Sequence, residues 1–262
     1  YPFTELPLSN RENLRIDGFN EGFEGLINEI IPQIMPKVYL EGYLKITTYI
    51  DNYGWPKKPK LIFTAISYNF DEIFKIWTAS KVEQGSRLVI GQHGGSLGLA
   101  KQTPAEEHYM KIADRFVTWG WENHHQNTQK SIFTKLIGQS QYKPDKEGNL
   151  LLLSTIISPL SYKMISAPIG FDQSIQYLQH HQKLMDGLQS EIREKLVFRL
   201  NELLEKRANI SYSEIMKVRN PNLKIDFSKN SIRNTLKSSR LIVITYNGTA
   251  MLETLFFNYP TI

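Results

Sequence analysis

The sequence contains no cysteine in 262 residues, which excludes a disulfide scaffold, a thiolate nucleophile and a cysteine-ligated zinc site. No apolar run approaches the roughly 18 residues that a helix needs to cross a bilayer, and no signal peptide opens the chain. The lack of cysteine also fits a reducing compartment. We therefore expect a cytoplasmic protein, peripheral to a membrane at most.

Several common site motifs are missing as well. There is no Gly-Lys-Thr of a Walker motif and no Gly-x-Gly-x-x-Gly, so the common ATPase and dinucleotide-binding classes lack their signatures. No Asp-x-Asp occurs, and the pairs His124-His125 and His180-His181 do not have the i, i+4 spacing of a helical metal site. We expect neither a metal ion nor a resident cofactor.

The charge balance is mildly basic, with a net charge of +5 and a pI near 9.1. Such a surface suits anionic ligands such as nucleotides or phosphates, or the inner face of a membrane, and is too weak to indicate nucleic acid. Hydrophobic residues make up 41% and charged residues 22%. The chain can therefore bury a real core, in one large domain or in two of ordinary size.

Apolar runs alternate with helical patterns in the first half of the chain. Buried strands are predicted at residues 60–66 and 87–91, with a helix at 71–84 between them that Asp71 or Asn69 would cap. Strand–helix–strand units of this kind form parallel sheets.

The pattern then repeats. Thr103 is the predicted N-cap of a second helix, and a strand follows at 115–118. Ahead of both units, an apolar helical stripe at 20–35 is interpreted as core packing.

The polar stretch at 143–149 is the expected linker between an N-terminal domain, 1–142, and a C-terminal domain, 150–262. Both domains are expected to be α/β and Rossmann-like and to face each other across a cleft, and both ends of the chain look truncated. The His180-His181 side of one C-terminal helix is expected to face solvent. In this half we predict strands at 150–157, 195–200, 223–227 and 240–245, helices at 172–188, 231–238 and 250–257, and a short charged stretch at 201–207.

The stretch 88–98, LVIGQHGGSLG, is the first candidate site. It reads as a buried strand that ends on a glycine turn, and the carboxyl end of such a strand is where open α/β sheets bind ligands. Gly94 and Gly95 would take positive φ and let the backbone, with Gln92 and His93, approach a ligand. The alternative is a tight turn with a hydrogen-bonded histidine.

A second candidate lies at residues 245–249, where a strand turns into a helix. Thr245, Asn247, Gly248 and Thr249 surround the unpaired N–H groups of the helix start, a good place for a phosphate. The alternative is an ordinary capped helix, with Glu253 on its first turns.

Four charged residues each have two competing interpretations. Arg199 lies within a strand run, where a charge usually points to solvent, but at the cleft it could bind a phosphate or carboxylate. Asp71 could be only a helix cap, but at the sheet edge it could share a cleft with His93. Glu106 and Glu107 start the following helix, as caps or as members of the same site.

Three segments carry a family resemblance: QHGGSLG at 92–98, ADRFVTWGW at 113–121 and ITYNGTAMLETLFFNYPTI at 244–262, with Glu107 between the first two. They resemble a family of bacterial surface-polysaccharide transferases, over most of the chain from about residue 36 onward. That family is distantly similar to the retaining β-Kdo transferases of capsule and lipopolysaccharide O-antigen synthesis, and more remotely to CDP-glycerol transferases. Those enzymes have the GT-B architecture of two Rossmann-like domains.

The resemblance implies a metal-independent glycosyltransferase that takes a sugar, such as Kdo or another nonulosonic acid, from a nucleotide-sugar donor. The acceptor would be a glycan or lipid-linked glycan. The donor would lie mainly in the C-terminal half, its phosphate held by the 245–249 turn with help from Arg199, and Ser154 would touch the nucleotide.

The 92–98 loop would face the reacting sugar on this reading. Asp71 would be the nucleophile of a double displacement, His93 would orient a substrate or transfer a proton, and Glu107 completes the catalytic candidates. The alternatives are a CDP-polyol phosphotransferase, a nucleotide-sugar 2-epimerase, and a non-catalytic domain that binds glycan or a partner.

Overall fold

The computed structural model describes residues 11–100, 104–141, 143–155, 173–200, 211–227 and 232–262. The chain divides into two compact units. The first consists of Tyr1–Gly91, Ile112–Val117 and His125–Gln129, and the second of Gln92–Lys111, Thr118–His124 and Lys130–Ile262. The predicted domain boundary at 143–149 stays a prediction.

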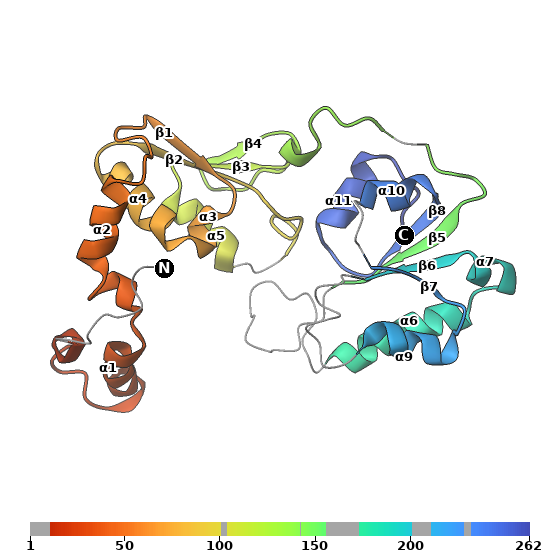
Figure 1. The fold of residues 1–262 in the computed structure, drawn as a ribbon, viewed down its shortest axis with the longest axis horizontal. Coiled ribbons are helices and arrows are strands. Elements are labelled where there is room, and N and C mark those ends of the chain that lie inside the picture. The colour runs from red at the N-terminus through yellow and green to blue at the C-terminus, as the bar shows by residue number, and fades with distance from the viewer. Residues whose placement is uncertain (1–10, 101–103, 142, 156–172, 201–210, 228–231) are drawn as a thin grey trace. The chain divides into compact units, whose positions relative to one another are not determined.

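The first sheet confirms the strands predicted in the first half (Figure 1). Strands β1 (Leu61–Thr64), β2 (Arg87–Gly91) and β3 (Arg115–Thr118) are parallel and adjacent in chain order. A polar edge strand, β4 (Thr128–Lys130), was not predicted. Parallel pairing through the intervening helix brings the carboxyl ends of β1 and β2 to one edge of the sheet.

Helices α2 (Tyr43–Asp51) and α4 (Glu72–Glu83) pack together in the first unit. Asp71 caps α4 as predicted, since its Oδ1 accepts a hydrogen bond of 3.0 Å from Phe74 N. Residues 67–70 form the single turn α3 (Ser67–Phe70). The helix predicted after the glycine loop is α5 (Pro104–Ile112), and its predicted cap, Thr103, lies outside the described residues.

Helix α1 (Gly22–Ile34) exists as predicted, but the core-packing interpretation of its apolar stripe is wrong. Phe23 is 75% exposed and Ile34 is 68% exposed. The buried residues of α1 are instead Gly25 and Pro32, which lie on the side of the helix opposite the stripe. Within its unit, α1 therefore presents its apolar face outward.

The second sheet has the order β7-β6-β5-β8, and all its described pairs are parallel. Its strands are β5 (Asn149–Leu153), β6 (Leu196–Arg199), β7 (Lys224–Asp226) and β8 (Ser239–Ile244). In chain order this is 3-2-1-4, the arrangement of a Rossmann-like half. From β5 the strand order runs to β6 and β7 on one side, and β8 is then added on the other side of β5. Open α/β sheets bind ligands at the point where the strand order reverses in this way, which is called the switch point.

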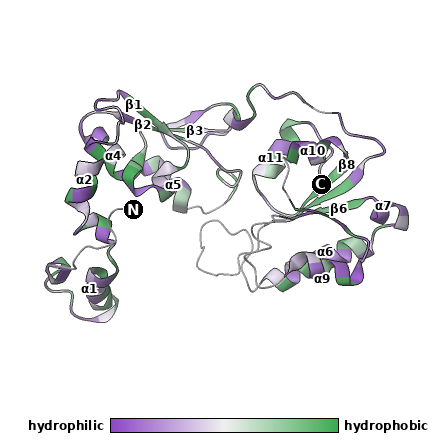
Figure 2. Cartoon of the chain, in the orientation of Figure 1, coloured by the Kyte–Doolittle hydropathy of each residue, from purple (hydrophilic) through white to green (hydrophobic). Residues whose placement is uncertain are grey.

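Alternating side chains of β5 enter two different cores. Leu150 and Leu152 face one cluster, and Leu151 and Leu153 face the other, because successive residues of a strand point to opposite faces. Figure 1 shows helices on both sides of this sheet, and Figure 2 shows its strands as predominantly hydrophobic. The covering helices are α6 (Ser174–Asp186) and α9 (Tyr212–Arg219) on one face and α10 (Ile232–Lys237) and α11 (Thr249–Phe256) on the other.

Three details of the second unit differ from the predictions. His181 on α6 is 2% exposed, so the expectation that the His180-His181 side faces solvent is wrong for this residue. Helices α7 (Ser190–Glu194) and α9 were not predicted. The predicted helix start at Asp172 and the charged stretch at 201–207 lie outside the described residues.

Candidate functional site

Gln92 holds the glycine loop in place rather than facing outward. Its side chain is 3% exposed, and Nε2 donates to the carbonyl oxygens of Gly94 (2.8 Å) and Leu97 (3.3 Å). Its Oε1 accepts from Trp119 N (2.7 Å) and Trp121 Nε1 (2.9 Å). These bonds use both donors and both acceptor positions of the amide. Gln92 thus joins the QHGG segment to the WGW segment, and its predicted contact with a ligand stays a prediction.

Glu106 holds the far end of the loop. Glu106 Oε2 accepts a hydrogen bond of 2.7 Å from Gly98 N. Glu107 is exposed, and its carboxylate pairs with Lys111 at 2.8 Å. The sequence did not predict the contact of Glu106 with the loop, and the catalytic role of Glu107 stays a prediction. Their position in the first turn of α5 gave no signal to separate them.

The structure does not confirm the positive φ that was predicted for the glycines at positions 94 and 95. Neither Gly94 nor Gly95 has positive φ, whereas Gly98 does, at 79°. A Cβ on Gly95 would lie 2.5 Å from the carbonyl carbon of Gly248, so at this position glycine is required for close approach. Gly94 has open space where its Cβ would be.

Both predicted sites meet within the second unit. Gly95 N donates a hydrogen bond of 3.2 Å to Thr249 Oγ1, the side chain of the first residue of α11. The loop thereby lies against the turn at 245–249, although 154 residues separate the two bonded residues. His93, partly exposed beside this contact, packs its ring against Tyr109 with the centroids 6.0 Å apart.

Polar groups also gather at the switch point between β5 and β8. The Tyr177 hydroxyl accepts from Thr155 N at 3.0 Å and is hydrogen-bonded to Thr245 Oγ1. Thr245 Oγ1 also donates to Leu153 O at 3.0 Å. The predicted Ser154 lies between these partners, partly exposed at the carboxyl end of β5. Sequence reasoning missed Tyr177, because nothing in α6 marks which of its residues reaches the sheet edge.

Arg199 is 8% exposed, so the solvent-facing orientation favoured from the sequence is wrong. It ends β6, and its guanidinium Nη1 pairs with the Asp226 carboxylate and donates to Thr235 Oγ1 at 2.9 Å. Asp226 ends the neighbouring strand β7, which explains how a buried charge is compensated. The arginine does lie at the carboxyl edge, and phosphate binding by it stays a prediction.

The start of α11 retains the features of an anion site. Its N-cap is Gly248, which has no side chain to cap the helix. Among the described hydrogen bonds, none uses the backbone N–H of Thr249 or Ala250. Such N–H groups, with the helix dipole, favour a negative charge. Asn247 is exposed on the turn before them.

Glu253 occupies the second turn of α11 and is 5% exposed. Its Oε1 pairs with Lys135 Nζ at 2.5 Å. Tyr246 lies close to it, and the pKa of Tyr246 is raised, mainly by burial and in part by Tyr177 and Glu253. The phenol at this turn is therefore a hydrogen-bonding group rather than a base at neutral pH.

The predicted nucleophile, Asp71, belongs to the first unit, and the glycine loop belongs to the second. Its Oδ1 is engaged as the cap of α4, which is the alternative that the sequence left open. A cleft shared by Asp71 and His93 stays a prediction.

Residues 94–98 also fit the Gly-x-Ser-x-Gly spacing of serine hydrolases. The elbow of those enzymes places the serine directly at a strand end. Here β2 ends at Gly91, five residues before the exposed Ser96. Among the described hydrogen bonds, none joins the Ser96 hydroxyl to a histidine, so the spacing carries no hydrolase site.

Among the described residues, no group of three or more His, Asp or Glu side chains is placed to hold a metal ion. No helix in the described ranges is both long and apolar enough to cross a membrane.

The second unit is thus an α/β unit of the Rossmann-like kind, with an uncapped helix start at the carboxyl edge of its parallel sheet and a glycine loop against that helix start. Comparison with known families narrows this class. A sequence model described as the LIC12162 family transferase matches residues 6–262, so the chain belongs to that family of transferases. A search of curated proteins found no match.

Proposed function

We propose that this transferase moves a sugar from a nucleotide-sugar donor to a bacterial surface glycan, with Kdo or another nonulosonic acid as the sugar. The observation that carries the proposal is the hydrogen bond between Gly95 N and Thr249 Oγ1. It brings the glycine loop against the start of α11, and these belong to two of the three segments that resemble the surface-polysaccharide transferases.

The donor phosphate would lie at the N-terminus of α11, where the Thr249 and Ala250 N–H groups and the Asn247 side chain are available. The nucleoside would extend over the switch point, past Ser154 and Tyr177. The net charge of +5 favours such an anionic substrate. No metal ion is included in the proposal, because the sequence has no Asp-x-Asp motif to bind one.

The proposed reaction is a double displacement. A carboxylate oxygen of Asp71 attacks the anomeric carbon, and the bond from that carbon to the nucleotide phosphate oxygen breaks. An acceptor hydroxyl then attacks the same carbon and displaces Asp71, while His93 accepts the hydroxyl proton. The acceptor is a glycan or a lipid-linked glycan at the cytoplasmic face of the inner membrane.

The first test is thermal stabilisation by CMP, CDP, UDP and GDP, each without added metal. A ligand present at one hundred times its dissociation constant stabilises the folded state by about 2.7 kcal/mol, which is a readily measured shift. A response to CMP alone supports the nonulosonic acid donor. A response to CDP would favour polyol-phosphate transfer, and a response to UDP or GDP an ordinary hexose donor.

The matched control is Asn247→Ala, which removes an exposed side chain from the proposed phosphate site. We expect this variant to melt at the same temperature as the wild type without nucleotide and to lose most of the nucleotide-dependent shift. No response of the wild-type protein to any nucleotide would overturn the proposal in favour of a domain that binds glycan or a partner.

A further inference from the structure

A groove of about 520 Å³ lies in the first unit, between one face of α4 and the chain that leads into α2. Its size is within the range of small-molecule sites, about 300–1,000 Å³. We propose that this groove holds neutral sugar residues of the acceptor glycan, beside the end of the glycan that reacts. The inference rests on the proposed function, because the class of the acceptor comes from there.

Two tyrosine rings line the side of the groove opposite α4. Tyr39 lies in the 3-10 turn η2 (Lys37–Tyr39) and is 39% exposed, and Tyr43 begins α2 and is 47% exposed. The face of an aromatic ring is negatively polarised, so it attracts the C–H groups on the flat side of a sugar ring. These two side chains therefore suit a ligand that carries both C–H faces and hydroxyl groups.

Helix α4 supplies hydrogen-bonding groups on the other side of the groove. Ser80, Glu83 and Gln84 line it and are exposed. Gln84 Nε2 donates to Ser80 Oγ at 3.1 Å, which leaves the amide oxygen and one N–H for a ligand. In the part of the chain that the structure describes, no ion pair or hydrogen bond uses the Glu83 carboxylate. A carboxylate beside an amide can bind neighbouring hydroxyl groups of a sugar, since the two groups together accept and donate.

The wall of the groove is fixed before a ligand binds. The Tyr39 hydroxyl donates to the Glu72 carboxylate, and Glu72 also pairs with Lys75. Ile76 lines the groove from the core of the unit and is 7% exposed. Side chains that are already held lose less conformational freedom when a ligand orders them.

The charges of the groove favour neutral sugars over anions. Glu72 compensates the Lys75 ammonium, so the Glu83 carboxylate leaves the groove with an excess of negative charge. A phosphate or an anionic lipid headgroup would be repelled there. An acyl chain is equally unsuited, because it would cover the carboxylate and amide groups without hydrogen-bonding to them.

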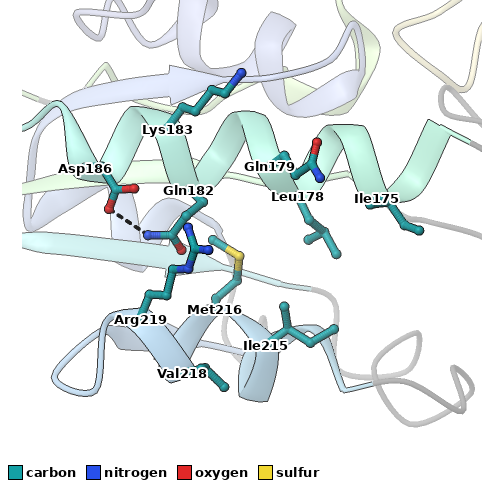
Figure 3. A pocket seen from close by; sticks show the side chains of 10 residues that line it. All are labelled: Ile175, Leu178, Gln179, Gln182, Lys183, Asp186, Ile215, Met216, Val218 and Arg219. Atoms are coloured by element: carbon teal, nitrogen blue, oxygen red, sulfur yellow. Dashed lines mark hydrogen bonds between the residues drawn. The ribbon is translucent and has the colours of Figure 1, made fainter.

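A larger groove in the second unit, between α6 and α9, lacks these features (Figure 3). It brings Lys183, Arg219 and Asp186 together with aliphatic side chains, and no aromatic side chain lines it. Charges of both signs without an aromatic wall do not select a sugar. This second groove therefore provides a control surface for the experiment below.

The position of the first groove along α4 fits the proposed reaction. Asp71 caps the amino end of α4, and the groove residues of this helix follow on one face from Lys75 to Gln84. At a rise of about 1.5 Å per residue, Glu83 lies about 18 Å along the helix axis from Asp71. A chain of sugars bound along this face has one end near Asp71, and the protein keeps hold of the glycan between transfers.

The experiment is isothermal titration calorimetry of the full-length protein with surface polysaccharide from the organism that makes it, freed of lipid, in about 0.5 M NaCl. At this ionic strength the attraction between an acidic polysaccharide and the basic protein is largely screened, whereas stacking and hydrogen bonds to neutral sugars remain. We expect the wild type to bind, and Tyr43→Ala and Glu83→Ala each to raise the Kd by about tenfold or more. Both side chains are exposed, so both variants should keep the melting temperature of the wild type.

Two control variants remove exposed side chains outside the groove. Phe23→Ala removes an aromatic ring of α1 that is 75% exposed, and Val218→Ala shortens an 80% exposed side chain of the α6–α9 groove. Both should bind the polysaccharide with the Kd of the wild type. Equal binding by all four variants and the wild type would overturn the inference, because the sugars would then lie elsewhere.

Stabilisation by CMP, CDP, UDP and GDP, measured on the same protein, separates this inference from the proposed function. If a nucleotide stabilises the protein but the polysaccharide does not bind, the inference is wrong and the proposed function stands. If the polysaccharide binds through the groove and no nucleotide stabilises the protein, the groove binds glycan and the transfer proposal is wrong. If neither ligand binds, both are overturned.

Discussion

Gln92 Oε1 accepts a hydrogen bond of 2.9 Å from the indole Nε1 of Trp121, which couples the QHGG segment to the WGW segment. The same oxygen accepts from Trp119 N, and the amide nitrogen holds the loop through two carbonyl oxygens. The orientation of the amide is fixed, because both groups facing its oxygen can only donate. The two motifs therefore behave as one structural piece.

Replacing Gln92 with glutamate should destabilise the protein by about 2 kcal/mol, since a buried carboxylate cannot donate to the Gly94 and Leu97 carbonyls. Chemical denaturation measures the free energy of unfolding. Gln176→Glu, at an exposed position of α6, is the control and should change it by less than about 0.5 kcal/mol. Equal stability of Gln92→Glu and the wild type would contradict the network described here.

Adjacent glycines give a second prediction. Gly95→Ala places a Cβ 2.5 Å from the Gly248 carbonyl carbon and 2.6 Å from Thr249 N, so it should cost about 1–3 kcal/mol and displace the loop from α11. Gly94→Ala meets no atom within 4 Å and should leave the stability unchanged. Melting temperatures of the two variants provide the comparison. If they shift equally, the close approach at Gly95 is not what requires glycine.

A third prediction separates the two roles of Asp71. Asn is as good an N-cap as Asp, so Asp71→Asn should keep the melting temperature while abolishing sugar transfer, because an amide is a poor nucleophile. Asp71→Ala should lose transfer and also about 1 kcal/mol of stability. The measurement is turnover with the nucleotide-sugar whose nucleotide stabilises the protein against thermal unfolding. Full activity of Asp71→Asn would leave the residue with its capping role alone.

The fourth prediction concerns the pH dependence of stability. Burial, with a smaller effect of neighbouring His180, lowers the pKa of His181 to about 4. The unfolded chain, with a pKa near 6.5, then binds the proton more tightly than the folded chain. The contribution to stability is complete above about pH 6.5, falls as the pH decreases toward 4, and amounts to about 3 kcal/mol.

His181→Phe should remove most of this pH dependence, because a phenyl ring can occupy the site between Tyr177 and Phe198 without a proton to bind. The matched control is His180→Gln, at the exposed neighbour, which should retain most of it. Urea denaturation between pH 7 and pH 4.5 makes the comparison. If the free energy of unfolding of His181→Phe changes with pH as strongly as that of the wild type, other groups cause the pH dependence.

Much of the fold could be predicted because buried parallel strands are continuous apolar runs. The strands at β1, β2, β5, β6 and β8 carry that signal, and the structure confirms them. Helix α9 was not predicted, because its buried residues do not form an apolar stripe. They are Tyr212, Ser213 and Met216. The apolar stripe of α1 was clear in the sequence, but hydrophobic periodicity shows only that one face of a helix is apolar. It does not show which surface covers that face.

The candidate site was predictable in its segments and not in its contacts. The glycine loop and the 245–249 turn were both identified, but their hydrogen bond joins residues that no local pattern connects. Arg199 shows the same limit. Its partner, Asp226, is set by the pairing of β6 with β7, and the register of that pairing depends on the whole sheet.

The order of the second sheet also constrains how the chain folds. The central strand β5 pairs on one side with β8, so that Leu151 contacts Ile242 only after almost all of this half has been synthesised. Until then, one edge of an apolar strand is open to pairing with other chains. Such non-local pairing makes folding slow. Newly made protein should therefore depend on chaperones during synthesis, and refolding yields should fall as protein concentration rises.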